Sequence, residues 1–404
     1  MNKNTPKNFI PIPFQYHEEI ELTISTLTNE GRGIGRINNW TIMVPFVIPG
    51  EKVKVRIFRN HKNYSEADLV KIIEPSPKRT ASPCPLFGQC GGCQYQHIDY
   101  AEQLQWKQQQ VIDCFERIGQ LKVTVNPLIP SEKTYGYRTK LTPHFERHND
   151  QCPIGFLQEG TQHRLVDVPQ CLIASEAINK ALPQIRTQIK QSNVRHGTLL
   201  LRETQTGVVS DFNTICETFI HNLTFQFPAG SFFQTNPYIL KAIFSFLTQR
   251  LQNRTDIQYL IDTYCGVGVF CIALAAHVQK FLGIEIDEKS IQLANNNMKN
   301  NHIDNGQFVA GNATTIFENA TFPADKSWVI MDPPRKGASE DFIRQLVNFS
   351  PKLISYISCA PDTQARDLNR LLTLAPQYKI TEVQPFDMFP QTKHMECIAI
   401  LERE

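Results

Sequence analysis

The chain has 404 residues, 41% hydrophobic and 20% charged, which is enough for two or three domains of an ordinary globular protein. Its 41 Lys and Arg residues balance its 39 Asp and Glu residues, which excludes a globally basic nucleic-acid-binding chain and leaves only a local basic patch. No apolar run is long enough to span a bilayer, and residues 1–4 are polar, unlike a signal peptide. We therefore expect a cytoplasmic protein without a membrane partner, whose 11 cysteines are thiols, metal ligands or catalysts.

The first predicted domain, residues 12–76, has the pattern of a small OB-like β-barrel. Its expected strands are short and broken by glycine, at residues 20–27, 41–47, 52–58 and 67–73. A glycine-rich stretch at residues 31–36 is predicted to be one of the turns. Basic side chains spread along the strands are more often a solvated face than a nucleic-acid site. They are Arg32, Arg36, Lys52, Lys54, Arg56, Arg59 and Lys62.

The same stretch resembles the TRAM domain of RNA-modifying enzymes. The resemblance rests on Asn-Glu-Gly-Arg-Gly at 29–33, Val-Pro at 44–45 and Pro-Gly-Glu-Lys-Val at 49–53. It implies a module that grips RNA.

Three cysteines lie close together in the loop that follows: Cys84, Cys90 and Cys93. Their spacing around a pair of glycines can bring three thiolates to one soft metal centre, which needs a fourth ligand. Cys171 is the candidate because residues 167–169 mark a rigid turn, while Cys114 and Cys152 compete with it. On spacing alone, a site of four thiolates fits zinc and an iron–sulfur cluster about equally.

Residues 77–229 form the second predicted domain, of α+β type, which carries the metal site. Residues 94–120 have the periodicity of a helix, with Gly119 as a stop. From residue 127 to residue 224, strand-like and helical patches alternate. Residues 135–140 combine aromatic and basic side chains, which fits RNA contact and a half-exposed strand equally well.

Residues 230–404 predict a doubly wound α/β domain. Asn236 and Pro237 have the residue types that start a helix, which should run to about residue 251. The next elements follow in the order of a nucleotide-binding unit: a strand at 258–262, a glycine turn at 263–268, a helix to about residue 277 and a strand at 280–284.

The glycine turn indicates which cofactor this unit binds. Gly266 and Gly268 are present, but a dinucleotide site would have a third glycine where the chain has Cys271. The missing glycine favours a cofactor without phosphates, S-adenosylmethionine. Glu285, after the second strand, would accept hydrogen bonds from the ribose, and Asn312 would lie near the adenine. Either residue could instead be an ordinary cap or loop group.

Three chemically different side chains are expected at one edge of the same sheet. Asp332 follows a strand at 328–331 on a rigid proline loop, and Cys359 follows a strand at 352–357. Glu396 returns to this edge at the start of the last strand of a C-terminal hairpin. A helix that begins two residues after Cys359 would favour its thiolate through the helix dipole.

Methylation of carbon 5 of a uracil would use all three side chains. That carbon is a poor nucleophile until another nucleophile adds to carbon 6, which Cys359 can do. Glu396 is the candidate general base that removes the carbon 5 proton after methyl transfer. Asp332, with Gln234, would hold the polar edge of a base that has left its stack, supported by the aromatic pair at 232–233.

Nearly the whole chain resembles the RNA uracil-5-methyltransferases that have an N-terminal TRAM domain and a four-iron, four-sulfur cluster. The motifs that carry this resemblance are the four cysteines named above, Phe-Gln-Thr-Asn at 233–236, Asp-Thr-Tyr-Cys-Gly-Val-Gly at 262–268, Glu285, Asp-Pro-Pro-Arg at 332–335, Ser-Cys at 358–359, and Glu396. The resemblance implies a Rossmann-like class I methyltransferase domain that uses S-adenosylmethionine.

The resemblance also implies roles for single residues. Cys359 would be the nucleophile and Glu396 the base. Cofactor binding would fall to Gln234, Tyr264, Glu285 and Asp332, with Asp332 also able to contact the uracil. The 4Fe-4S cluster would be bound by Cys84, Cys90, Cys93 and Cys171. The expected partner is structured RNA, either rRNA or tRNA, and we expect a monomer.

Two positions depart from the family pattern. Ala360 replaces the Asn that usually follows the nucleophile, and Val269 replaces a small polar residue after the second glycine. We expect them to alter substrate position or rate without abolishing the chemistry.

Two other interpretations compete with this one. A methyltransferase acting on an exocyclic nitrogen needs only the Asp-Pro-Pro loop, and would leave Cys359 and Glu396 without roles. A non-enzymatic RNA-binding or RNA-folding protein needs neither those residues nor the glycine turn.

Overall fold

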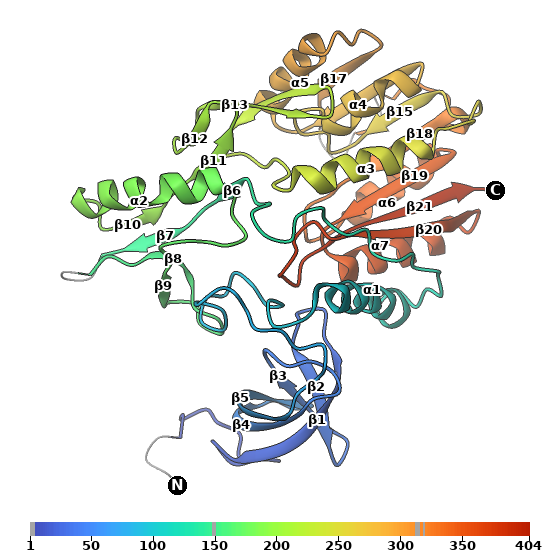
Figure 1. Ribbon diagram of the computed structural model, residues 1–404. Coiled ribbons are helices and arrows are strands. Elements are labelled where there is room, and N and C mark those ends of the chain that lie inside the picture. Colours follow the sequence, from blue (N-terminus) through green and yellow to red (C-terminus); the bar gives the residue numbers. More distant parts are fainter. Residues whose placement is uncertain (1–4, 148–150, 312–315, 318–319) are drawn as a thin grey trace. The chain divides into compact units, whose positions relative to one another are not determined.

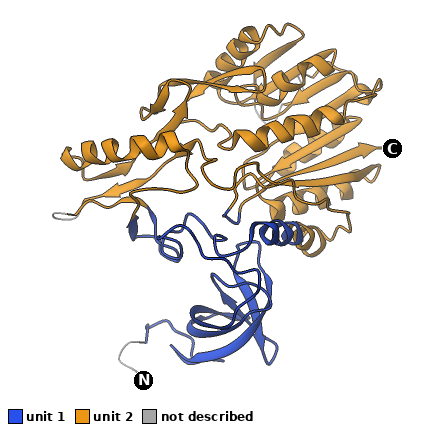
Figure 2. Cartoon of the chain, in the orientation of Figure 1, with its two compact units in different colours: residues 1–110, 156–166, 391–393 blue, residues 111–155, 167–390, 394–404 orange. Residues whose placement is uncertain are grey.

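The computed structural model describes residues 5–147, 151–311, 316–317 and 320–404. The chain forms two compact units, which Figure 2 shows in different colours. Unit 1 comprises residues 1–110, 156–166 and 391–393, and unit 2 comprises residues 111–155, 167–390 and 394–404. The three domain boundaries expected from the sequence stay a prediction.

Unit 1 contains a closed five-stranded barrel, which confirms the predicted architecture (Figure 1). Its strands, in the order β1-β2-β3-β5-β4, are β1 (Glu19–Leu27), β2 (Gly33–Ile37), β3 (Trp40–Val44), β4 (Lys52–Asn60) and β5 (Tyr64–Glu74). Alternate side chains of these strands, such as Ile24, Ile42 and Val53, fill an apolar core of their own.

Two glycines predicted to form a turn lie inside strand β2 instead. A Cβ atom on Gly33 would lie 2.2 Å from Val47 Cγ2, and one on Gly35 would lie 1.9 Å from Leu22 Cδ1. Close packing inside the barrel therefore explains these glycines, and the turn predicted at residues 31–36 is wrong for its second half.

Four of the seven basic side chains on the barrel are paired with carboxylates. Arg32 and Arg59 pair with Glu66, while Lys52 and Lys54 pair with acidic side chains of β1. This pairing is typical of a solvated charged face. Among the described residues, Arg36, Arg56 and Lys62 of the barrel form no ion pair, so RNA binding by the barrel stays a prediction.

Short sheets and two helices follow the barrel. They are α1 (Tyr100–Arg117), β6 (Lys140–Leu141), β7 (His144–Glu146), β8 (Ile154–Leu157), β9 (Leu165–Asp167), α2 (Glu176–Gln191), β10 (His196–Thr198), β11 (Leu201–Thr204), β12 (Gly207–Val209), β13 (Ile215–Ile220) and β14 (Leu223–Pro228). The strands pair in the orders β10-β7-β8-β9, β12-β11-β6 and β13-β14. Helix α1 begins later than predicted because the N–H groups of Gln94 and Tyr95 both donate to the Gln391 carbonyl, at 3.1 and 2.9 Å.

The aromatic and basic segment around β6 is used inside the fold. The ring of Tyr137 is buried, and its hydroxyl donates to the Pro390 carbonyl at 2.9 Å. Lys140 Nζ donates to the carbonyls of Gly230 and Ser231 at 2.9 and 3.1 Å. A buried ring cannot stack on a base, so Tyr137 has a structural role, while RNA contact by the rest of this segment stays a prediction.

Unit 2 is built on a seven-stranded sheet, which confirms the predicted doubly wound domain (Figure 1). In the order β17-β16-β15-β18-β19-β21-β20, its strands are β17 (Gly306–Ala310), β16 (Lys280–Glu285), β15 (Tyr259–Asp262), β18 (Ser327–Met331), β19 (Leu353–Ser358), β21 (Glu396–Arg403) and β20 (Tyr378–Phe386). The first five are parallel, and β21 is antiparallel to both of its neighbours. The carboxyl ends of the parallel strands therefore share one edge.

Helices cover the sheet, with α3 passing in front of it and α6 and α7 behind it in Figure 1. The helices are α3 (Pro237–Gln249), α4 (Val269–Leu274), the 3-10 helix η1 (Ala275–His277), α5 (Glu288–Asn300), the 3-10 helix η2 (Ala324–Lys326), α6 (Glu340–Phe349) and α7 (Pro361–Leu374). Asn236 caps α3 as predicted, since its Oδ1 accepts from the N–H groups of Tyr238 and Ile239. Among the described residues, no helix combines the length and the apolar character needed to cross a membrane.

Candidate active site

Polar side chains stand at the ends of four neighbouring strands. β15 ends at Asp262 and β16 at Glu285, while β18 ends one residue before Asp332 and β19 one residue before Cys359. Glu396 is the first residue of β21, which enters the sheet at the same edge because it is antiparallel to β19. The convergence predicted for Asp332, Cys359 and Glu396 follows from this topology.

The register between β19 and β21 places the predicted nucleophile beside the predicted base. Ser358 lies opposite Cys397 in this antiparallel pair, so one further step of the register brings Cys359 opposite Glu396. Directly opposite side chains of antiparallel strands have Cβ atoms about 4.5–5.5 Å apart. The charge of Glu396 also acts on the Cys359 thiol, as expected for neighbours.

Arg335 also lies beside Cys359, although no role was predicted for it from the sequence. Its guanidinium donates a hydrogen bond to the Cys359 sulfur, and its Nη2 lies 2.8 Å from Nδ1 of His394. Because arginine is always protonated and has only donors, this contact stabilises the thiolate. The available signal was its place immediately after the rigid Asp-Pro-Pro loop.

Burial and like charges perturb the titration of this site. Burial, with the charges of Glu396 and Asp332, raises the pKa of Cys359, and Arg335 opposes that rise. Burial and the charge of Asp332 raise the pKa of Glu396 well above its usual range. Burial also raises the pKa of Asp332. Strongly perturbed groups gathered at the end of a sheet are typical of reactive sites.

These shifts predict that activity rises with pH. The nucleophile must be a thiolate and the base a carboxylate, so both are needed in deprotonated forms whose pKa values are raised in the free protein. We expect kcat/KM to increase steadily between about pH 6 and pH 9. Rapid-quench methylation rates measured across that range would show this rise. A rate that falls as the pH increases would contradict the roles given to Cys359 and Glu396.

Next to this group, Glu285 is fixed by backbone donors at the end of β16. Its carboxylate accepts hydrogen bonds from the N–H groups of Gly266, Ile286 and Asp287, at 3.1, 2.8 and 3.2 Å. Gly266 has a φ of +53°, and a Cβ atom built on it would meet nothing within 4 Å. Open space therefore lies at the glycine turn beside a carboxylate held in place.

Asp262 is a second carboxylate at this turn and, unlike Glu285, it is buried; no role was predicted for it from the sequence. Burial raises its pKa to about 8, opposed by the N–H of Tyr264 and reinforced by the charges of Asp332 and Glu285. Among the described residues its Oδ2 has no hydrogen-bond partner. The sequence feature that could have indicated a role for Asp262 is its position as the last residue of the strand before the glycine turn. An orphaned buried oxygen beside open space fits a polar cofactor such as S-adenosylmethionine.

The two glycines of the turn should respond differently to alanine. A Cβ atom on Gly268, at φ +88°, would lie 2.6 Å from Phe308 Cζ, whereas Gly266 faces open space. We expect Gly268→Ala to lower the free energy of unfolding by about 3 kcal/mol, from overlap and backbone strain together. Gly266→Ala should cost about 1 kcal/mol but weaken S-adenosylmethionine binding. Urea unfolding and calorimetry separate the two effects, and undiminished cofactor affinity in Gly266→Ala would contradict this placement of the cofactor.

Of the other contacts predicted from the sequence, Tyr264 lies in the turn between β15 and α4, and the roles of Gln234 and of the aromatic pair at 232–233 stay predictions. Gln234, in the loop before α3, lines a separate cavity of about 450 Å³. Phe233 is buried and stacked on Phe227 at a centroid distance of 4.0 Å, whereas Phe232 is 79% exposed. Phe232 is thus open to solvent, while Phe233 lines the same cavity as Gln234. Asn312 lies outside the described residues.

The cysteines fall into two classes. Cys84, Cys90, Cys93, Cys171 and Cys359 are half-buried and the other six are buried, including the competing candidates Cys114 and Cys152. Burial raises the pKa of Cys90, and Cys84 adds to the rise, so these two thiols interact. Within the described ranges, however, no three His, Cys, Asp or Glu side chains converge in a way that could hold a metal ion. The metal site therefore stays a prediction.

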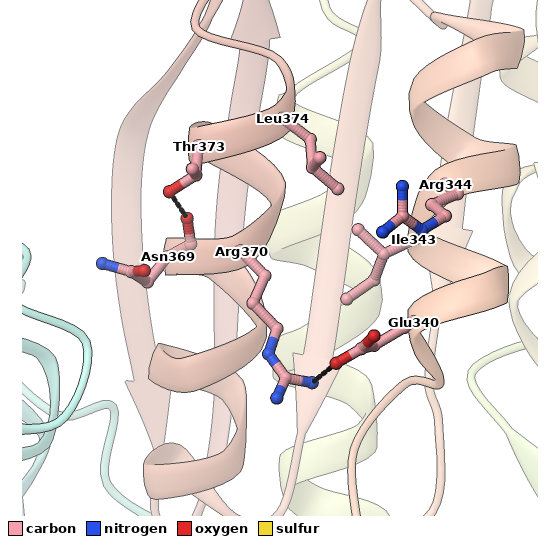
Figure 3. A pocket seen from close by; sticks show the side chains of 7 residues that line it. All are labelled: Glu340, Ile343, Arg344, Asn369, Arg370, Thr373 and Leu374. Carbon is pink, nitrogen blue, oxygen red and sulfur yellow. Dashed lines mark hydrogen bonds and ion pairs between the residues drawn. The ribbon is translucent and has the colours of Figure 1, made fainter.

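A hollow of about 270 Å³ between α6 and α7 contains none of the residues proposed for the site (Figure 3). Its lining includes Glu340 and Arg370, which form an ion pair across the two helices, and the apolar side chain of Leu374. It lies between helices and not at the strand ends, so we assign it no part in the chemistry.

Comparison with known proteins identifies the family. The model of the family described as tRNA (Uracil-5-)-methyltransferase matches residues 202–404, and that of the TRAM domain matches residues 14–70. The chain is 37% identical to the tRNA (uracil(54)-C(5))-methyltransferase of Schizosaccharomyces pombe, over 96% of this chain and 79% of that protein. The chain belongs to the tRNA (uracil-5-)-methyltransferase family. The predicted family and the predicted enzyme class, RNA (uracil-5-)-methyltransferase, are confirmed.

Two further comparisons agree with membership of the tRNA (uracil-5-)-methyltransferase family. An uncharacterized RNA methyltransferase of Synechocystis sp. is 34% identical over 98% of both chains. The solved structure of Pyrococcus abyssi tRNA (uracil-54, C5)-methyltransferase in complex with S-adenosyl-L-homocysteine has a TM-score of 0.72 at 24% identity. It covers 95% of this chain and 100% of that one. This second likeness shows the shared fold.

In this member of the tRNA (uracil-5-)-methyltransferase family, the two unusual residues are accommodated locally. Ala360 has no capping side chain, but its N–H donates to Ser358 Oγ at 3.1 Å and its carbonyl accepts from Thr363 Oγ1 at 3.0 Å. Val269 is the first residue of α4 and packs against the apolar core. The turn after the nucleophile therefore remains hydrogen-bonded without the usual asparagine.

Proposed function

We propose that this protein methylates carbon 5 of a uridine in structured RNA. The observation that carries the proposal is that Cys359 follows β19 directly after the Ser358–Cys397 pair, beside Glu396 of β21, with Arg335 on the thiol. We further propose tRNA as the first substrate to test, because relatives from two yeasts are named tRNA (uracil(54)-C(5))-methyltransferases. Ribosomal RNA is the alternative substrate. The active form is proposed to be a cytoplasmic monomer.

The first step is covalent addition to the base. The Cys359 thiolate adds to carbon 6 of the uracil, forming a sulfur–carbon bond and moving the electron pair of the 5,6 double bond to carbon 5 and the carbonyl oxygen. Arg335 opposes the rise in the pKa of this thiol that burial causes, and so favours the ionised form that attacks. The carbon 5 position, now an enolate carbon, is nucleophilic enough to accept a methyl group.

The second step is elimination. Glu396 removes the proton from the methylated carbon 5, the double bond returns, and the sulfur–carbon bond breaks to release Cys359 as a thiolate. The raised pKa of Glu396 suits a group that must accept a proton near neutral pH. Asp332, at the end of β18, is placed to hold the polar edge of the base or the cofactor.

S-adenosylmethionine supplies the methyl group when bound. We propose that Glu285 binds its ribose hydroxyls, that Asp262 meets a polar group through its unpartnered oxygen, and that Gly266 leaves the necessary space. Tyr264 and Asn312 remain proposed contacts to the same cofactor.

The test of this function is a reaction of the purified protein with S-adenosylmethionine and separate unmodified transcripts of tRNA and rRNA. Nucleoside mass spectrometry should detect 5-methyluridine in one of them, and fragment mapping should locate it. Methylation of an exocyclic nitrogen would favour the first competing interpretation. Absence of S-adenosylmethionine binding would favour a non-enzymatic RNA-binding protein.

We also propose that Cys84, Cys90, Cys93 and Cys171 bind a 4Fe-4S cluster. Their half-buried positions support the proposal, because the other cysteines apart from the nucleophile are buried. No step of the reaction is assigned to the cluster.

Replacing any one of these four cysteines by serine should lower the bound iron and sulfide severalfold and remove the broad absorption near about 400 nm of protein purified without oxygen. Cys152→Ser, a change at a buried competitor, should retain the metal. Equal iron content in all five variants would contradict the proposed ligand set.

A further inference from the structure

A second cavity, of about 450 Å³, lies within unit 2 beside the loop that carries Gln234. Its walls come from β11, β13, the start of α3 and the loops near them, and they include Lys133, Arg202, Gln205, Phe219, Gln234 and Tyr238. Neither Cys359 nor Glu396 is among the described residues that line it. A mixed polar and aromatic cavity of this size is within the range of ligand pockets.

One wall of the cavity is held rigidly. Arg202 and Lys140 are paired in register between β11 and β6, and both donate to the Ser231 carbonyl, at 2.9 and 3.1 Å. Lys140 also donates to the Gly230 carbonyl at 2.9 Å. Two cations thus fix the loop that precedes Gln234, so this wall is preformed.

Lys133 and Arg202 are the cationic side chains in the lining, whereas Lys140 holds the adjoining loop and does not line the cavity. Arg202 is only 1% exposed yet lines the cavity, and burial lowers its pKa to about 10. Burial, with the charge of Arg202, lowers the pKa of Lys140 to about 8. Glu176 and Glu203 also line the cavity, and the charges of both act on Lys133; Glu176 is exposed and paired with Lys180 at 2.6 Å. The donors of Arg202 are occupied by the carbonyls of Ala229, Phe233 and Ser231, so the exposed ammonium of Lys133 is the cation that an anionic group can reach.

Aromatic rings also line the cavity. Phe219 on β13 is 51% exposed, so its ring is accessible to a ligand. The ring of Tyr238 lies under Lys133 Nζ, 5.1 Å from the ring centroid. Exposed rings beside cations are the arrangement on which single-stranded nucleic acids stack their bases.

We propose that this cavity binds one unpaired nucleotide of the RNA substrate, distinct from the target uridine. Its base stacks on Phe219 and Tyr238, and its phosphate lies toward Lys133. The inference rests on the proposed function, since it presumes an RNA substrate. Gln234 lines the cavity and belongs to the loop before α3. A nucleotide bound in the cavity would therefore position the RNA close to this loop.

The test compares RNA affinity of full-length variants that keep the fold. Phe219→Ala and Lys133→Ala remove the proposed stacking and phosphate contacts. Ile215→Ala is the control for Phe219, because it lies on the same strand at 50% exposure and does not line the cavity. Lys241→Ala on α3 is the control for loss of one exposed positive charge. The probe is an unmodified tRNA transcript, or the rRNA transcript if that is the one methylated.

We expect Phe219→Ala to bind this RNA about fivefold to a hundredfold more weakly than the wild type, with S-adenosylmethionine affinity unchanged. Transcripts with single abasic nucleotides on either side of the target should contain one position whose loss weakens wild-type binding but has no further effect on Phe219→Ala. Equal affinities for Phe219→Ala and Ile215→Ala, or no such position, would overturn the inference. If the nucleotide site is overturned in this way but the wild type methylates RNA, the proposed function stands and only the nucleotide site fails. If the wild type binds no S-adenosylmethionine, the proposed function itself fails.

Discussion

Cys359→Ala is expected to lower RNA methylation by about 10⁴-fold or more, to the background of the assay. Without the thiol no covalent bond to carbon 6 forms, so carbon 5 is never activated. The side chain is half-buried and its removal leaves the β19 to β21 ladder intact, so the fold should persist. Nucleoside mass spectrometry of the product RNA measures the loss, with S-adenosylmethionine affinity as the check on folding.

Cys397→Ala is the matched control for this variant. Cys397 lies in β21 next to Glu396, and because side chains alternate along a strand it points to the opposite face. The free energy of unfolding of Cys397→Ala should be lower by about 1 to 2 kcal/mol, as expected for a shortened buried side chain. This variant should still methylate RNA. Methylation by Cys359→Ala at the wild-type rate would remove the thiol from the mechanism and move the nitrogen-directed reaction to first place.

Glu396→Gln is expected to stop the reaction after methyl transfer and not before it. The amide cannot accept the carbon 5 proton, so the bond between Cys359 and carbon 6 persists and turnover falls by about 10² to 10⁴-fold. Protein and RNA should then migrate together on a denaturing gel, and mass spectrometry of the digested adduct should find the methylated base on Cys359. The adduct should require S-adenosylmethionine.

Glu402→Gln provides the charge control on the same strand. This side chain pairs with Arg254 at 2.9 Å at the far end of β21, so its loss should change stability by less than about 1 kcal/mol and trap nothing. A Glu396→Gln variant that turns over normally without an adduct would show that another group removes the proton. A double variant of Cys359→Ala with Glu396→Gln should form no adduct at all.

The ends of the strands could be predicted because each is marked by a short stretch of neighbouring residues in the sequence. An apolar run followed by a polar residue marks Glu285, Asp332 and Cys359, and parallel strands must bring such ends to one edge. The same logic placed Glu396 at the start of the return strand. These positions therefore needed only the periodicity of the chain and the rules of sheet topology.

The missed features depend on contacts between distant segments. The hydrogen bond from Arg335 to Cys359 joins two loops, and the position of this arginine after the Asp-Pro-Pro loop does not by itself show that it contacts the thiol. The buried state of Asp262 follows from the strands on both sides of it. Gly33 and Gly35 looked like turn residues because the side chains that exclude a Cβ atom come from other strands of the barrel.

The antiparallel pairing of β19 with β21 also governs which changes in chain length the enzyme can tolerate. Helix α7 and strand β20 lie between Cys359 and Glu396 in sequence, yet the ladder alone sets their separation in space. Insertions in the loops around α7 would leave the two residues opposed. A deletion of one residue inside β21 would instead turn Glu396 to the other face of the sheet. Changes in loop length should therefore preserve activity, whereas changes in the length of β21 should abolish it.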